Sequence, residues 1–196
     1  MAPPRILIIP GSARVQALSK RVADAAVTAV HRAGGLATRI DLSHFELPLY
    51  NAELETRDGL APAVRRLQAL IAGHEALLIA SPEYNGSITP LLLNALDWCS
   101  RPDPNHPLTS GLPIFADKPA AILGSSPGRL GGLRAMAQVR DLLGYLGMIV
   151  IPQQLAVPRA HDAFDVSGEL LDLTQRAKLD TVASALVRAA TRCAAN

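Results

Sequence analysis

The chain has 196 residues, of which 49% are hydrophobic and 4% aromatic, and its formal net charge is +2. A chain of this length buries roughly 70% of the surface that it exposes when unfolded, so one domain spanning residues 1–196 can hold its core without disulfides or a structural metal. The small charge, with no basic run longer than two residues, excludes a dedicated nucleic-acid-binding protein.

Apolar segments and cysteines also limit where the protein acts. No apolar run approaches the roughly 20 residues of a membrane span, so no membrane partner is expected. The first residues lack the apolar segment of a secretion signal. Cys99 and Cys193 lie far apart and form no CxxC motif, which is typical of a reducing compartment, so the predicted location is the cytoplasm.

Short apolar runs, separated by enough chain to hold a helix, are the main structural signal. They predict strands at residues 5–9, 36–41, 75–80, 119–124 and 148–151. Helical spacing is found in the segments between them: Val22, Ala26, Val30 and Ala33 before Gly34-Gly35, and Leu133, Met136, Leu143 and Leu146 before Gly147. Another helix is predicted to begin at Thr89-Pro90, and a last one to follow Ser167 towards Cys193.

The predicted strands are continuous apolar runs without polar alternation. This pattern is typical of parallel strands that are covered by helices on both faces. Five strands that alternate with helices therefore predict an α/β fold with a doubly wound parallel sheet. Ligands of such sheets bind beyond the carboxyl ends of the strands, so the loops that follow the strands are where a site is expected.

Residues 10–20 follow the first strand and lead into a helix. Backbone N–H groups and the positive end of the helix dipole favour an anion there. Ser12 and Ser19 add neutral donors, and Arg14 can make a charge-assisted contact to a phosphate. The GxGxxG of a dinucleotide fold and the GK[ST] of a P-loop are both absent. A terminal phosphate is the simplest ligand, and the alternative is a helix start with a solvent-facing Arg14.

Residues 81–90 follow the third strand and combine Pro82, Asn85 and Gly86 within five positions. Such a loop has a constrained backbone and can present peptide groups to the edge of a flat heteroaromatic ring. Tyr84 could lie along that ring and Asn85 could bond to it. The alternative is an ordinary turn before the next helix.

Residues 124–132 follow the fourth strand, and four of these nine residues are glycines, which permit close approach of a ligand. A Gly-x-Ser-x-Gly pattern centred on Ser126 also matches the nucleophile elbow of serine hydrolases, with Asp141 and His161 in the chain order of that class. Pro127 argues against a hydrolase, because the oxyanion hole needs an N–H at this position.

Other site types receive less support from the sequence. The five histidines show no metal-ligand spacing, and His31 and His74 are expected at the surface. Ser81-Pro82 stands where a phosphoacceptor domain needs an aspartate. Residues 101–118 hold four prolines and are predicted to be a loop, either a lid or contact surface or a mobile segment.

Taken together, three motifs in order at three predicted strand ends resemble the NADPH-dependent FMN reductase family of flavodoxin-like quinone, azo and chromate reductases. The motifs are Gly11-Ser12-x-Arg14, Pro82-Glu83-Tyr84-Asn85-Gly86-Ser87 and Ser125-Ser126-Pro127-Gly128-x-x-Gly131-Gly132. The likeness extends to Leu47-Pro48-Leu49-Tyr50-Asn51 and Asn94-Ala95-Leu96-Asp97-Trp98 and covers about residues 5–157. It implies a three-layer, flavodoxin-like fold with a five-stranded sheet in the order 2-1-3-4-5.

The resemblance implies FMN as the cofactor and NADPH or NADH as the co-substrate. It places the FMN phosphate on Ser12, Arg14 and Ser19 and on the backbone N–H groups of Ala17 and Leu18. It places the flavin ring and ribityl chain along Pro82, Glu83, Tyr84, Asn85 and Gly86, with Ser125, Ser126 and Gly128 on the opposite side. Many relatives carry Ser at position 17 and Asn at position 19, so FMN binding is expected to weaken by about 0.5–1.5 kcal/mol per neutral bond lost.

The implied reaction passes hydride from NAD(P)H to the flavin and then to a quinone-like, azo, metal-oxyanion or free-flavin acceptor, with ping-pong kinetics. The flavin N5 carries the hydride, so no catalytic residue is named. A homodimer or homotetramer is implied, with Tyr50, Trp98 and residues 101–118 as candidate contacts, although Trp98 fits core packing equally well.

Two alternatives to the reductase remain. A flavodoxin-type one-electron carrier tends to be acidic and to sandwich the ring between aromatic side chains, whereas this chain has a net charge of +2 and few aromatics. The other is a flavin-binding module without turnover.

Overall fold

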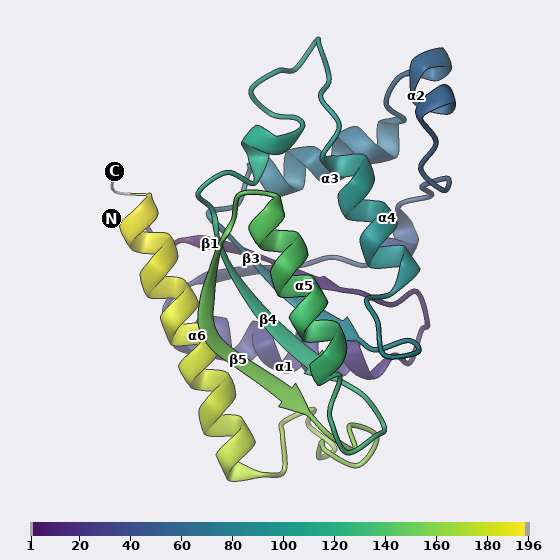
Figure 1. Ribbon diagram of the computed structural model, residues 1–196. Coiled ribbons are helices and arrows are strands. Elements are labelled where there is room, and N and C mark those ends of the chain that lie inside the picture. The colour runs from purple at the N-terminus through teal and green to yellow at the C-terminus, as the bar shows by residue number, and fades with distance from the viewer. Residues whose placement is uncertain (1, 195–196) are drawn as a thin grey trace.

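The computed structural model describes residues 2–194. Five parallel strands form one sheet in the order β2-β1-β3-β4-β5, with helices on both faces (Figure 1). The strands are β1 (Arg5–Pro10), β2 (Leu36–Arg39), β3 (Ala76–Pro82), β4 (Pro119–Ser125) and β5 (Ile149–Val157). The predicted three-layer α/β fold and its strand order are confirmed.

The helices divide between the two faces of the sheet. One face carries α1 (Leu18–Arg32) and α6 (Leu173–Cys193), and the other carries α3 (Pro62–Ala72), α4 (Pro90–Cys99) and α5 (Leu133–Tyr145). The connections contain α2 (Ala52–Asp58) and two 3-10 turns, η1 (Leu42–His44) and η2 (Leu112–Ile114).

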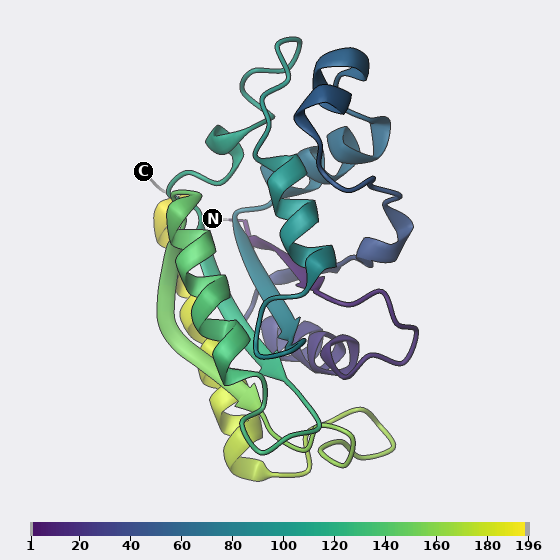
Figure 2. The same ribbon diagram turned by 45° about the vertical axis from the view of Figure 1, so that its right-hand side comes forward.

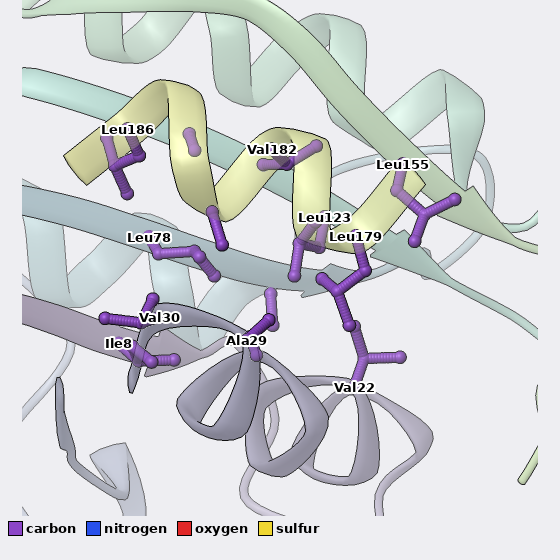
Figure 3. Close-up of a cluster of buried hydrophobic side chains, with 14 of the residues drawn as sticks. Ile8, Val22, Ala29, Val30, Leu78, Leu123, Leu155, Leu179, Val182 and Leu186 are labelled. Carbon is purple, nitrogen blue, oxygen red and sulfur yellow. The ribbon is translucent and has the colours of Figure 1, made fainter. Parts of the chain in front are cut away.

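Successive residues of the central strands point to opposite faces, and both faces are buried. Ile6 and Ile8 of β1 pack against α1 and α6, whereas Leu7 and Ile9 pack under α3, α4 and α5. Figure 3 shows the first of these cores, in which side chains of α1 and α6 meet those of the strands. This two-sided burial is the reason that the central strands appear in the sequence as unbroken apolar runs.

Element boundaries differ from the prediction mainly near the C-terminus. β5 ends at Val157, whereas the prediction ended this strand at residue 151. The prediction stopped short because this edge strand alternates buried and exposed residues and includes Gln153-Gln154, so its second half is not an unbroken apolar run. The last helix begins only at Leu173, where Asp172 accepts hydrogen bonds from two N–H groups of its first turn. Residues 158–172 therefore form a long loop beyond β5.

Residues 101–118 form an ordered loop at the end of the molecule opposite to the strand carboxyl ends (Figure 1, Figure 2). Within the loop, Asp103 is 2% exposed, accepts a hydrogen bond from Arg65 Nε at 2.6 Å, and donates its N–H to Ser110 Oγ at 2.7 Å. This hydrogen bond from Arg65 is the largest of the interactions that lower the pKa of Asp103 to about 2. This position excludes a lid over the strand ends of the same chain.

Burial contradicts the surface prediction for His74 and decides between the two interpretations of Trp98. His31 is exposed as predicted, but His74 is buried, and its Nδ1 lies 2.6 Å from the Leu70 carbonyl oxygen near the end of α3. Trp98 is 1% exposed, its Nε1 donates to the Pro48 carbonyl at 2.7 Å, and its ring meets Tyr50 edge-on at 5.0 Å. Trp98 is thus a core residue and not a subunit contact.

Candidate functional site

The loops that follow β1, β3 and β4 leave the same edge of the sheet. Pro10 is paired with Ala80, and Pro82 is paired with Ser125, so the three strands end almost level with one another. The three sequence motifs therefore lie next to each other, where the doubly wound fold binds its ligands.

The loop after β1 leads into a helix whose N-terminus lacks a side-chain cap. The N-cap residue of α1 is Ala17, and the first turn contains no acidic residue. The Ala17 N–H donates to the Arg14 carbonyl at 3.3 Å, so Leu18 and Ser19 supply the helix N–H groups without an intrahelical acceptor. Free N–H groups at a helix N-terminus are the donors that bound anions commonly accept from.

Side chains of the same loop also have unmet hydrogen-bonding capacity. Ser19 is fully buried, and its Oγ has no hydrogen-bond partner within residues 2–194. Arg14 is exposed, and no carboxylate of the described chain pairs with it. Ser12 is 2% exposed, and its Oγ accepts the Arg14 N–H at 3.3 Å. Arg14 and Ser19 therefore keep side-chain donors that no other described residue uses.

Lys20, the next residue of α1, is already neutralised. Its Nζ lies 2.6 Å from Asp41 Oδ2, and both side chains are largely buried. Burial by itself would raise the pKa of Asp41, but hydrogen bonds from Lys20 and Ser43 lower it to about 2. Arg14 is therefore the side chain of this loop that has a positive charge to offer an anion.

The loop after β3 is a tight turn. Tyr84 and Ser87 exchange two backbone hydrogen bonds, at 3.1 and 3.0 Å, across Asn85 and Gly86, whose φ angles are 51° and 75°. Positive φ at both central residues is what a type I′ turn requires, and Asn-Gly is its preferred sequence. The turn presents Tyr84, which is 42% exposed, with its hydroxyl 3.3 Å from Ser12 Oγ.

Backbone and side-chain groups of α5 hold this turn in place, an arrangement that the sequence did not predict. Glu83 accepts hydrogen bonds from the N–H groups of Arg134 and Ala135, at 3.1 and 3.3 Å, and pairs with Arg134 Nη1 at 3.1 Å. Gln138 Nε2 donates to the Gly86 carbonyl at 3.0 Å. The Glu83 carboxylate is therefore occupied by α5, and its backbone is what remains for a ligand.

The loop after β4 begins with a buried serine. Ser125 is 1% exposed, and its Oγ has no partner among the described residues. Ser126 Oγ instead accepts the Gly128 N–H at 3.2 Å. Because Ala160 N–H donates to the Ser126 carbonyl at 3.0 Å and Arg159 N–H to the Gly128 carbonyl at 3.1 Å, residues 158–172 are joined directly to this loop.

Most of the glycines of this loop serve packing inside the protein. A Cβ on Gly124 would collide with Met136, and one on Gly131 would lie 2.8 Å from the Pro158 nitrogen. A Cβ on Gly132 would lie 3.1 Å from the Ser125 nitrogen. At Gly128 the nearest atom would be Ser126 Oγ at 3.5 Å, so Gly128 is the position that leaves room for a ligand.

The serine hydrolase alternative finds no support in the geometry. His161 Nε2 lies 2.9 Å from Asp162 Oδ2, and no hydrogen bond joins Ser126 to an imidazole in the part of the chain that the structure describes. Across residues 2–194 there is also no group of three metal-binding side chains and no helix long and apolar enough to cross a membrane.

Comparisons with known proteins point to one family. Residues 4–162 match the family model of the NADPH-dependent FMN reductases. The chain is 42% identical to an NAD(P)H-dependent FMN reductase of Pseudomonas aeruginosa over 127 residues, which are 64% of each protein. It is 32% identical to a quinone reductase of Pseudomonas putida over 171 residues, which are 87% of this chain and 86% of that protein.

A solved structure covers nearly the whole chain. The flavoenzyme NAD(P)H:(acceptor) oxidoreductase FerB of Paracoccus denitrificans superposes with a TM-score of 0.80 at 25% identity, over 96% of this chain and 98% of the other. An archaeal flavodoxin superposes with a TM-score of 0.61 at 13% identity over 95% of this chain and 99% of the other, which shows a shared fold. On its sequence and its architecture, this chain belongs to the NADPH-dependent FMN reductase family.

Proposed function

We propose that this protein is an NAD(P)H-dependent FMN oxidoreductase that transfers hydride from the nicotinamide to bound FMN and then to a quinone-like, azo, metal-oxyanion or free-flavin acceptor. The observation that carries the proposal is the set of unmet donors at one sheet edge: the uncapped N-terminus of α1, the Arg14 guanidinium, and the buried hydroxyls of Ser19 and Ser125. An anionic and polar ligand satisfies all of them, which is why FMN fits this site.

The FMN phosphate is assigned to the N-terminus of α1. The proposed donors are the Arg14 guanidinium, the hydroxyls of Ser12 and Ser19 and the N–H groups of Leu18 and Ser19, and the helix dipole adds to the attraction. The Ala17 N–H, which the resemblance also assigned to the phosphate, donates to the Arg14 carbonyl at 3.3 Å, and the Ser19 N–H takes its place in the proposal. Ser12 anchors the Arg14 backbone through its Oγ. Ala17 at the N-cap has no hydroxyl to offer the phosphate, so the backbone N–H groups of the first turn are the donors that remain there.

The flavin ring and ribityl chain are assigned to the two neighbouring loops. One wall consists of Pro82, Glu83, Tyr84, Asn85 and Gly86, held by α5, and the other of Ser125, Ser126 and Gly128. Bound FMN supplies the redox chemistry, and these residues bind and orient it. Tyr84 is the one aromatic residue in the three loops, so one face of the ring is left for nicotinamide and acceptor to use in turn, with ping-pong kinetics.

The other properties of the protein are proposed on the same basis. Residues 1–196 form one FMN-binding domain, the protein works in the cytoplasm, and it assembles as a homodimer or homotetramer. Two strongly exposed leucines support the assembly, Leu49 at 81% exposure and Leu108 of the 101–118 loop at 87%. Light scattering of the purified protein tests the assembly.

Titration with FMN followed by a quinone assay tests the main proposal. We expect micromolar or tighter FMN binding and NAD(P)H oxidation that depends on added benzoquinone. A stable blue semiquinone on partial reduction, without NAD(P)H oxidation, would instead establish a one-electron carrier. FMN binding with neither property would leave a binding module without turnover.

A further inference from the structure

A cavity of about 470 Å³ adjoins the loop after β4 on the side of β5. In Figure 1 this loop and the segment after β5 lie together at the lower end of the molecule. The cavity is lined by Arg129 from the first loop, by Pro158, Arg159 and Leu171 from the second, and by Asp172 and Gln175 at the start of α6. None of these residues was assigned to the FMN site above.

The backbone couples this cavity to the proposed flavin site. Arg129 follows Gly128 directly, and the Arg159 N–H donates to the Gly128 carbonyl at 3.1 Å. Arg159 has a φ of 46°, an uncommon conformation for a residue other than glycine. Two arginines from different loops are thus joined through the backbone to Gly128, the residue that leaves room for the ligand.

Both guanidinium groups are available to an anion. Arg129 and Arg159 are exposed, and neither is paired with a carboxylate among residues 2–194. Two carboxylates also line the cavity, and neither pairs with Arg129 or Arg159: Asp162 lies 2.9 Å from His161, and Asp172 Oδ1 accepts the N–H groups of Thr174 and Gln175 at 2.7 and 3.2 Å.

The same cavity offers features that suit more than a bare anion. The Gln175 Oε1 is buried and has no partner in the described chain, so it can accept a hydrogen bond from a ligand amine or hydroxyl. Pro158 and Leu171 provide apolar surface, and Leu171 is 57% exposed. A phosphate attached to a ribose and a flat base matches two arginines, an amide acceptor and an apolar wall.

We propose that this cavity binds the adenosine 2′-phosphate end of NADPH and that Arg129 and Arg159 set a preference for NADPH over NADH. The proposal rests on the proposed function. Arginine suits the role because its planar fork of donors matches a phosphate, and the 2′-phosphate is the group that distinguishes the two dinucleotides.

Steady-state kinetics of the FMN-loaded enzyme test the preference. In Arg129→Ala and Arg159→Ala, we expect kcat/KM for NADPH to fall by about tenfold or more, because each variant loses a charge-assisted hydrogen bond to the 2′-phosphate. We expect kcat/KM for NADH to stay nearly unchanged, because NADH lacks this phosphate. Arg188→Ala is the matched control, because Arg188 is an exposed arginine on α6 that does not line the cavity. Equal losses for both dinucleotides in the two cavity variants would overturn the proposal.

Equilibrium binding separates this inference from the proposed function, because it needs no turnover. Calorimetric titration of the whole protein with 2′,5′-ADP and with 5′-ADP should show tighter binding of 2′,5′-ADP, and Arg159→Ala should remove the difference while Arg159→Lys retains part of it. Equal affinity of the unmodified protein for the two compounds would refute the cavity assignment. Absence of FMN binding would refute the proposed function and leave this titration unaffected.

Discussion

The Oγ of Ser12 lies 3.3 Å from the hydroxyl of Tyr84, and this contact joins the loop after β1 to the loop after β3. The two residues are 72 positions apart in the chain. The contact therefore ties the proposed phosphate site to the proposed ring site, and the backbone N–H of Arg14 shares the same Ser12 oxygen.

Tyr84→Phe removes the hydroxyl and keeps the ring. We expect FMN to bind more weakly by about 0.5–1.5 kcal/mol, the value of one neutral hydrogen bond, because Ser12 is no longer held against the turn. Flavin fluorescence titration measures the change. Tyr84→Phe and Ser12→Ala should show less than additive losses when combined, and strictly additive losses would show that the contact does not contribute.

Arg14→Ala removes the free positive charge next to α1. FMN binding should weaken by about tenfold or more, as expected for a charge-assisted bond, whereas riboflavin binding should not change because riboflavin has no phosphate. Parallel titrations of the two flavins measure this, with Arg188→Ala as the control. An equal loss for both flavins would remove Arg14 from the phosphate site.

Ala17→Ser supplies the side-chain cap that α1 lacks. In the absence of flavin, we expect the free energy of unfolding to rise by about 1 kcal/mol, because the serine oxygen can accept an N–H of the first turn. Urea denaturation measures the change, and Ala13→Ser, at an exposed position outside the helix, is the control. Unchanged stability would show that the helix N-terminus is satisfied in another way.

The Lys20–Asp41 pair should make stability depend on pH. Hydrogen bonds from Lys20 and Ser43 outweigh burial and lower the pKa of Asp41 from 3.8 to about 2. Because the pKa is lower in the folded state, the stabilisation is complete above pH 3.8 and is lost as the pH falls towards 2. Urea denaturation between pH 5 and pH 2, with Glu46→Gln as a control at an exposed carboxylate, measures the loss.

Removing one partner of this pair should cost more than removing both. Asp41→Asn leaves the Lys20 ammonium without its partner in a largely buried site, so we expect a loss of about 3–5 kcal/mol at pH 7. The double variant Lys20→Met, Asp41→Asn should recover much of that loss. A double variant no more stable than Asp41→Asn would show that the charge left without a partner is not the cause.

The sequence by itself determined the alternation of strands and helices and the loops in which a site is expected. Unbroken apolar runs such as Ile6–Ile9 indicated strands buried on both faces. Pro82, Asn85 and Gly86 indicated a loop with a constrained backbone, which the structure shows to be a tight turn. Thr89-Pro90 marked the start of α4. These features depend on neighbouring residues or on regular spacing along the chain, which is why they can be predicted before the fold is known.

Tertiary structure decided which side chains are available for a ligand. Glu83 is occupied by α5, 51 residues further along the chain, and Trp98 and His74 are buried by segments that no local pattern identifies. The hydrogen bonds that join residues 158–172 to the loop after β4 likewise form only because β5 ends beside β4. Hydrogen bonds between distant segments arise only when the helices and strands pack, so their partners are absent from the local sequence.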